Sequence, residues 1–205
     1  PNTRVRRLAE RARYDEATVH AILDDAYVAH VGTIVDGAPV VMPYACARVG
    51  EELVLHGSTR AGTLSAVANG TPVCATVTHL DGLVLARSAF HSSMNYRSVV
   101  LHGVARIIED AEEKVRLLDA LVDRLLPGRR AQLRASTQGE LDATQVVALR
   151  IDTVSAKVRG GGPKDAPEDL EPEMWGGVIP LALTRGEPQP DATTRPGVTA
   201  PTLEG

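Results

Sequence analysis

The stretch HVGTIVDGAPVVMPYACARV, residues 30–49, decides the expected fold because it holds two runs of strand-forming residues. The runs 30–35 and 39–49 are rich in valine and other residues that favour β-strands. Between them lies Asp36-Gly37, a dipeptide typical of the two-residue turn that joins antiparallel strands. The stretch therefore predicts a β-hairpin, and it favours an antiparallel sheet as the basis of the fold.

Similar runs recur along the chain and predict further strands. They are LVLHG (53–57), VCATVTH (73–79), LVLAR (83–87), YRSVVLHGVARII (96–108), TQVVALRID (144–152) and VSAKVR (154–159). Asp81-Gly82 predicts a second tight turn, between the runs 73–79 and 83–87. About six or seven strands joined mainly by hairpins favour a mainly-β fold over alternating strands and helices. Closing such a sheet removes exposed edges, so we expect a small antiparallel β-barrel with peripheral helices.

Three helical segments are expected beside the sheet. Asp15 can cap a helix that runs to about Ala29, with an acidic residue in its first turn. A short helix over 63–69 can end at Gly70, and residues 111–126 carry an apolar stripe at helical spacing. The chain is then expected to divide into a basic arm (1–14), the barrel (15–160) and a C-terminal linker and tail (161–205) that includes the docking segment WGGVIPL.

The composition describes an ordinary globular protein with a slightly acidic charge. Of its 205 residues 43% are hydrophobic, and the formal net charge is −4. That charge argues against nucleic acid as the main partner, although five arginines in the N-terminal arm leave DNA contact as a weaker alternative. No apolar run approaches the ~20 residues of a membrane helix, and no secretory signal is recognised. Cys46 and Cys74 form no CxxC motif, so we expect reduced thiols and a cytoplasmic protein.

Two polar stretches carry most of the candidate chemistry. HGSTR, residues 56–60, leaves a strand and enters a helix, so its hydroxyls and guanidinium can cradle an anion. Ser58 and Thr59 could equally be simple helix caps. The second stretch, FHSSMNYRS (90–98), places Arg97 in an apolar strand, where it needs either a protein carboxylate or an anionic ligand. The six histidines show no metal-binding spacing, so no metal site is expected.

Together these segments resemble the pyridoxamine 5′-phosphate oxidase-like superfamily of FMN-binding split barrels. The resemblance is to its flavin-nucleotide-binding branch, which includes the nitroimidazole-resistance proteins. It spans roughly residues 4–181 and is most specific in HGS (56–58) and FHSSMNYRS. The resemblance implies a split β-barrel that forms a homodimer, with FMN in a groove between the two subunits.

The resemblance also assigns residues to the flavin site. The HGSTR segment would hold the phosphate and ribityl chain, and the segment 42–44 would run along the isoalloxazine. The expected cofactor-binding residues are Met42, Pro43, Tyr44, His56, Gly57, Ser58, Thr59, Arg60, Asn95, Tyr96, Arg97, Ser98, Lys157 and Trp175. His56 and His91 are the candidate catalytic residues, the first beside the reactive site and the second as a proton donor. Trp175 could instead anchor the C-terminal segment to the barrel.

The resemblance implies an FMN-dependent oxidoreductase that moves two electrons to or from a small organic substrate, such as a nitro compound. No nicotinamide fingerprint is present in the sequence, so NAD(P)H would visit the flavin only transiently. The alternative is a non-catalytic protein that binds or sequesters a flavin, or haem through His56. FAD and a deazaflavin remain open as replacements for FMN.

Overall fold

The computed structural model describes residues 3–60, 62–171 and 173–201. In these ranges ten strands form one antiparallel sheet in the order β1-β9-β6-β5-β2-β3-β4-β8-β7, and β10 pairs with β5. The strands are β1 (Ala12–Arg13), β2 (Val28–Val35), β3 (Ala38–Val49), β4 (Glu52–Ser58), β5 (Val73–Leu85), β6 (Ser93–Gly103), β7 (Arg106–Ile107), β8 (Thr144–Arg150), β9 (Val154–Arg159) and β10 (Gly177–Pro180). The order does not close on itself, so the predicted antiparallel split barrel is confirmed as a half-barrel with peripheral helices.

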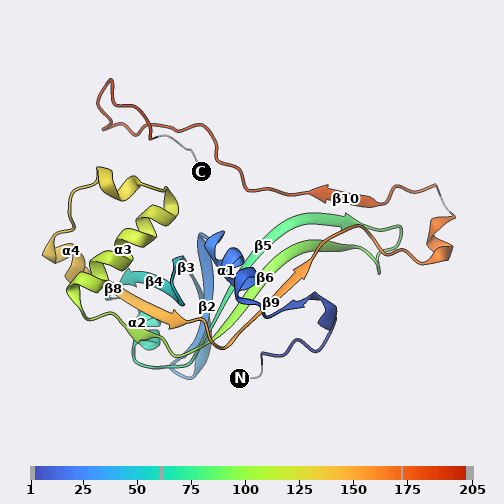
Figure 1. Cartoon of the computed structure of the whole chain (residues 1–205), viewed down its shortest axis with the longest axis horizontal. Coiled ribbons are helices and arrows are strands. Elements are labelled where there is room, and N and C mark those ends of the chain that lie inside the picture. Colours follow the sequence, from blue (N-terminus) through green and yellow to red (C-terminus); the bar gives the residue numbers. More distant parts are fainter. Residues whose placement is uncertain (1–2, 61, 172, 202–205) are drawn as a thin grey trace.

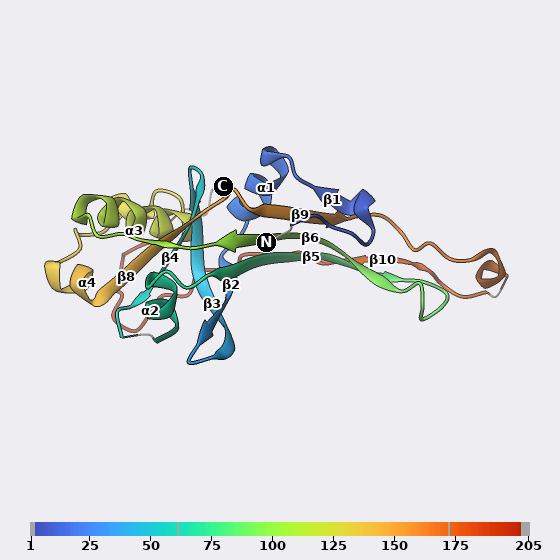
Figure 2. The same ribbon diagram turned by 90° about the horizontal axis from the view of Figure 1, so that it is seen from below.

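The helices lie around this sheet. They are α1 (Glu16–Asp24), α2 (Gly62–Ala68), α3 (Ala111–Leu125) and α4 (Gln138–Ala143), with short 3-10 helices at Ala9–Arg11, Arg129–Gln132 and Pro167–Leu170. Figures 1 and 2 show α3 and α4 at one end of the molecule, while β5, β6, β9 and β10 extend toward the other end as a long arm. Helices α3 and α4 thus lie at one end of the sheet, whereas α1 lies near its middle and contacts β5, β6 and β9.

The β2–β3 hairpin forms as predicted. Asp36 and Gly37 have φ angles of 50° and 79°, the left-handed conformation that a tight hairpin turn of this kind requires. Aspartate tolerates this conformation better than most residues with a side chain, and glycine adopts it freely. The turn therefore sets the register in which Val35 pairs with Ala38.

The turn predicted at Asp81-Gly82 is wrong. β5 continues through both residues to Leu85, with only a register shift between Leu80 and Gly82. Gly82 pairs with Asn95 of β6 on one side and with Pro180 of β10 on the other. Pairing on both edges holds the strand extended, and the chain reverses only in the loop 86–92. Leu83, Val84 and Leu85 of the predicted strand LVLAR are therefore the last part of β5, and Ala86 and Arg87 lie in the loop.

The helix predicted to end near Ala29 is shorter than expected. Asp15 caps α1 as predicted, because its Oδ1 accepts a hydrogen bond of 2.9 Å from the Thr18 amide. The helix ends at Asp24, however, and Ala29 already belongs to β2, where it pairs with Tyr44. Strand β2 thus begins at Val28, within the region where the sequence predicted the end of the helix.

The main core lies between the sheet and helices α1 and α2. Its fully buried side chains include Val19, Ile22 and Leu23 of α1, and Leu64 and Val67 of α2. Full burial of such a side chain stabilises the fold by about 1.5–3 kcal/mol. A smaller cluster under α3 includes Leu117 and Leu121 of this helix, whereas Leu125 is 58% exposed.

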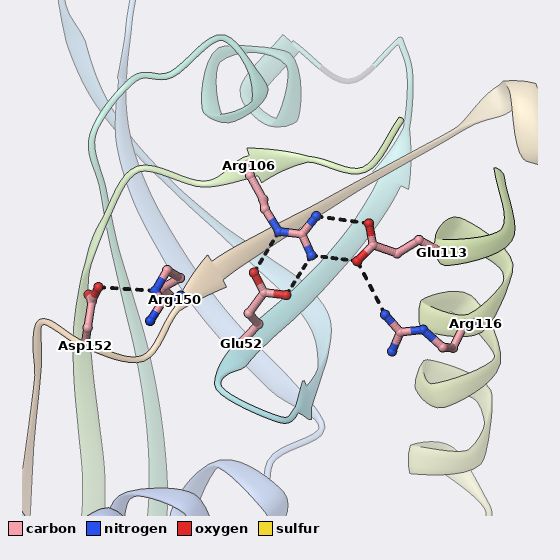
Figure 3. A network of polar contacts seen from close by, with 6 residues as sticks. All are labelled: Glu52, Arg106, Glu113, Arg116, Arg150 and Asp152. Atoms are coloured by element: carbon pink, nitrogen blue, oxygen red, sulfur yellow. Dashed lines mark hydrogen bonds and ion pairs between the residues drawn. The ribbon is translucent and has the colours of Figure 1, made fainter. Parts of the chain in front are cut away.

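A charged network attaches α3 to the sheet (Figure 3). Arg106 on β7 contacts Glu52 of β4 at 2.7 Å and Glu113 of α3 at 2.7 Å, and Arg116 also reaches Glu113. The hydrogen bonds from Arg106 lower the pKa of Glu52. Arg106 is partly exposed, so each pair adds little stability, but together they fix the position of the helix.

The two terminal segments are tied to the arm. Ala12 of β1 pairs with Lys157 of β9, and β10 pairs with β5 from Gly177 to Pro180. The described residues after β10, 181–201, form turns but no helix or strand, and they return toward α3 (Figure 1). The described part of the chain contains no helix that is long and apolar enough to span a membrane.

Candidate functional site

The loop between β4 and α2 presents the HGSTR segment at the surface. Ser58, Thr59 and Arg60 are all exposed. The Thr59 amide and hydroxyl both donate to the Ala143 carbonyl, at 3.0 and 3.3 Å, and the Arg60 amide donates to Ser58 Oγ at 3.2 Å. Thr59 therefore anchors the loop to α4, while Ser58 and Arg60 are placed where an anion could reach them.

His56 lies just below this loop and is half-buried. Burial lowers its pKa, because the charged imidazolium loses its hydration. Its Nδ1 is buried, and among the described residues it has no hydrogen-bond partner. Burial therefore favours the neutral imidazole of His56, at the start of the HGSTR segment.

Tyr44 of β3 packs against the same loop. A Cβ atom added to Gly57 would lie 3.7 Å from the Tyr44 ring and 3.0 Å from Leu64, so only glycine lets the three groups approach this closely. Burial raises the pKa of Tyr44, whose hydroxyl also bonds to Thr63 of α2. The structure thus places the Tyr44 ring close to Gly57, at the start of the HGSTR segment.

Met42 and Pro43 lie on the same strand as Tyr44 and are exposed. The pairing of β3 with β4 ends at Cys46 and Leu55. Beyond that pair, in the described residues, β3 has an open edge on this side that includes Met42 and Pro43. A planar ligand could lie along this edge, beside the loop.

Arg97 lies in a different part of the molecule. Three strands, β5, β2 and β3, separate β6 from β4 in the sheet order. Arg97 donates to Asp81 on β5 at 3.1 Å and to Asp25 beyond α1 at 2.6 Å, and these hydrogen bonds raise its pKa. The sequence left open whether Arg97 pairs with a protein carboxylate or with an anionic ligand, and the structure shows two protein carboxylates. Within one chain, Ser58 and Arg60 do not line the pocket that contains Arg97.

The other polar residues of β6 contact β9 and the glycine-rich turn after it. Asn95 is buried, accepts a hydrogen bond from Arg159, and donates to the Gly161 carbonyl at 3.1 Å. The Ser98 hydroxyl donates to the carbonyl of Lys157 at 3.4 Å, and Tyr96 pairs with Arg159. Four of the expected cofactor-binding residues thus lie together on the paired strands β6 and β9, away from HGSTR: Asn95, Tyr96, Ser98 and Lys157.

His91 lies at the tip of the arm. Its Nδ1 is 2.8 Å from Ser88 Oγ and 3.5 Å from a carboxylate oxygen of Asp169. Both partners approach the same ring nitrogen, whereas a serine-histidine-aspartate triad uses one nitrogen for each. Arg87 similarly contacts Asp165, so these contacts connect the tip to the C-terminal segment.

Trp175, near the same tip, is 65% exposed, and its ring lies against Gly177. The prediction that it anchors the C-terminal segment is therefore wrong. The backbone pairing of β10 with β5 attaches the segment instead.

One cluster of titratable groups was not predicted from the sequence. Glu16, His20 and Glu51 place their polar atoms within 4.8 Å of one another. Glu16 approaches Nδ1 of His20 and Glu51 approaches Nε2, at 3.7 and 3.4 Å. The Glu16–His20 spacing of four residues on a helix was a detectable signal, but the contribution of Glu51 comes only from the fold.

Comparisons with known proteins were made against family models, curated proteins and solved structures. A family model described as pyridoxamine 5′-phosphate oxidase matches residues 15–158. No curated protein matches. The FAD and haem binding protein from Mycobacterium smegmatis is 43% identical, with a TM-score of 0.90, covering 93% of this chain and 94% of that one.

Two further solved structures are informative. The flavocytochrome Anf3 from Azotobacter vinelandii is 42% identical with a TM-score of 0.91, covering 97% of this chain and 92% of that one. A protein described as a 5-nitroimidazole antibiotic resistance protein from Bacteroides thetaiotaomicron shares the fold, at 23% identity and a TM-score of 0.60, covering 72% of this chain and 86% of that one. Because the family model covers most of the half-barrel and two structures above 40% identity cover nearly the whole chain, this chain belongs to the pyridoxamine 5′-phosphate oxidase family.

Proposed function

We propose that the protein binds a flavin together with haem. The observation that carries this proposal is the extent of the similarity to the two proteins whose names state flavocytochrome or FAD and haem binding. The family model ends at residue 158, whereas these two structures cover 93% and 97% of the chain. They therefore share parts of this chain beyond the half-barrel. In this proposal the flavin is FAD instead of FMN. The binding of flavin and haem, which was the alternative expected from the sequence, becomes the main function.

The β4–α2 loop is suited to the phosphate part of a flavin. Ser58 and Arg60 are exposed there, and a guanidinium and a hydroxyl are suitable partners for a phosphate. The open edge of β3 from Met42 to Tyr44 offers a flat border for the ring system. A side chain at position 57 would collide with Leu64, so Gly57 allows this edge of β3 to lie close to the loop.

His56 is suited to hold haem iron, because iron binds the neutral imidazole and burial already favours that form. A flavin can accept two electrons and release them singly to a haem, which is the chemistry that the pair would supply. Reduction of a small organic substrate, with NAD(P)H as a transient donor, stays a prediction. The contacts of His91 with Ser88 and Asp169 do not test its predicted role as a proton donor.

A homodimer remains part of the proposal. Apolar side chains lie uncovered on the sheet and the arm, among them Val41 at 63%, Met42 at 41% and Phe90 at 89% exposure. Exposed apolar surface of this kind is typical of an interface. A second copy could also place residues of its own next to the β4–α2 loop of the first. Sedimentation analysis tests this directly, and a monomer would contradict it.

The experiment that tests the cofactor proposal starts with the absorption spectrum of the purified protein. We expect flavin bands and a Soret band, and extraction should release FAD. His56→Ala should lose the Soret band and retain the flavin, whereas the control His30→Ala, on an exposed position of β2, should keep both. FMN without any haem, before and after haem is supplied, would contradict the proposal.

A second variant tests the flavin loop. Arg60→Gln should weaken flavin binding about tenfold or more, as expected for the loss of one charge-assisted hydrogen bond. Arg195→Gln, in the C-terminal segment, is the matched control because it removes the same charge elsewhere. Equal flavin affinity in the two variants would remove Arg60 from the site.

A further inference from the structure

A pocket of about 610 Å³ lies beneath the segment that follows β10. Its walls come from three parts of the chain that are distant in sequence. The α1–β2 junction contributes Asp25 and Tyr27, the arm contributes Asp81 and Arg97, and the end of α3 contributes Arg124. The segment 181–185 closes the remaining side, and Figure 1 shows this part of the chain returning along the body of the protein.

The positive charges in this pocket are not equally compensated. Arg97 is bound by both carboxylates of the pocket, Asp25 and Asp81. Arg124 donates to the Ala26 carbonyl at 3.0 Å, and Arg185 donates to the Tyr27 hydroxyl at 3.2 Å. Within the described residues, neither Arg124 nor Arg185 has a carboxylate partner.

Arg124 and Arg185 converge on the same aromatic ring. The guanidinium carbon of Arg124 lies 4.3 Å from the centre of the Tyr27 ring, and Arg185 binds the hydroxyl of that ring. The hydrogen bond from Arg185 lowers the pKa of Tyr27. Two guanidiniums and a phenol therefore surround a position that favours negative charge.

An apolar wall continues from this charged position. A second hollow of about 990 Å³ shares Tyr27, Leu183 and Arg185 with the pocket and is also lined by Leu125 and Leu126. Leu125 and Leu183 both line this second hollow. They are 58% and 87% exposed, so both present apolar surface to a ligand there. The combined site thus has a cationic end and an apolar end.

We propose that this site binds a small organic carboxylate, with the carboxylate on Arg124 and Arg185 and the apolar part against Leu125 and Leu183. The three arginines and two aspartates of the pocket leave one net positive charge, which suits a monoanion better than a phosphate dianion. The site depends on Arg185 and Leu183, which lie outside the residues matched by the family model. The residues that carry the flavin and haem proposal, Ser58, Arg60 and His56, do not line this pocket, so the two proposals can be tested on separate residues.

Isothermal titration of the purified protein tests this site, with benzoate and hexanoate as probes and inorganic phosphate and benzyl alcohol as comparators. We expect both carboxylates to bind and both comparators to bind at least tenfold more weakly. Arg185→Gln should weaken benzoate binding about tenfold, as expected for the loss of a charge-assisted contact. Arg195→Gln is the control, because it removes an arginine from the same exposed segment, and it should leave the affinity unchanged.

The exposed position of Arg185 means that its substitution leaves the core intact, and the flavin and haem content of Arg185→Gln should equal that of the unmodified protein. Failure of either probe to bind, or equal benzoate affinity in Arg185→Gln and Arg195→Gln, would overturn the inference. So would phosphate binding as tightly as benzoate. None of these results bears on the presence of FAD or haem, because that is measured separately by absorption.

Discussion

Arg97 on β6 donates to Asp81 on the neighbouring strand β5, with 3.1 Å between Nε and Oδ2. The same guanidinium reaches Asp25 beyond the end of α1 at 2.6 Å. Arg97 therefore links the arm of the sheet to the helix that covers the core. A ligand phosphate at Arg97 would have to displace one of these carboxylates, so the predicted role of Arg97 in cofactor binding requires a rearrangement of the pair.

A double-mutant cycle on Arg97→Met and Asp81→Asn measures this relationship. Because each side chain is 35% exposed, solvent screens the pair, and we expect a coupling free energy of about 0.5–1 kcal/mol in urea unfolding. We also expect Arg97→Met to keep its full flavin content. Flavin loss in Arg97→Met with normal stability would instead place the guanidinium on the cofactor.

The two Asp-Gly pairs of the chain show which parts of the fold the sequence could predict. At Gly37 no atom lies within 4 Å of the position of a Cβ, so the turn is free to follow its local preference. At Gly82 the strand is flanked by β10, whose residues lie nearly a hundred positions later in the chain. The local sequence pattern correctly predicted the β2–β3 hairpin, because the turn alone determines it. The same pattern failed at Asp81-Gly82, because pairing with the distant strand β10 keeps β5 extended there.

Substitution of Gly82 tests whether β10 holds the C-terminal segment on the arm. A Cβ at this position would lie 3.0 Å from Val178 and 3.1 Å from the Ile179 carbonyl. Gly82→Val should therefore weaken β10 docking by about 1–3 kcal/mol, so protease cleavage in residues 163–171 should quicken about tenfold. Gly186→Val is the control, because nothing lies within 4 Å of that position. Equal cleavage rates would show that β10 contributes little to docking.

The two cysteines should differ in reactivity. Burial raises the pKa of Cys46 to about 11, whereas Cys74 is half-buried at the wall of an apolar pocket of about 560 Å³. A pKa of about 11, against 9.0 for a free thiol, leaves about a hundredfold less thiolate at Cys46. We expect Ellman's reagent to modify Cys74 first and Cys46 only after unfolding. If Cys74→Ser still shows a rapidly reacting thiol, the expected order is wrong.

Part of the candidate site could be anticipated from local sequence, and part could not. Tyr44 and the HGSTR loop meet because β3 and β4 are consecutive strands joined by a short turn, so hairpin register alone brings them close. The partner Asp25 of Arg97 is 72 positions away, and no local pattern connects them. The pocket around Tyr27 needs residues 181–185, and the sequence did not predict that this part of the C-terminal segment would reach Tyr27.

The burial of His56 predicts a specific dependence of stability on pH. Its pKa in the folded protein is lowered, while in the unfolded chain it should be near 6.5. The unfolded state therefore binds the proton more tightly, so this histidine's contribution to stability is present above that pH and is lost as the pH falls. The free energy of unfolding should drop less in His56→Gln than in the unmodified protein between about pH 8 and pH 5. The control His30→Gln removes an exposed histidine. Urea unfolding of the haem-free protein at several pH values makes the comparison, and parallel curves for His56→Gln and the unmodified protein would show that His56 is hydrated in the folded state.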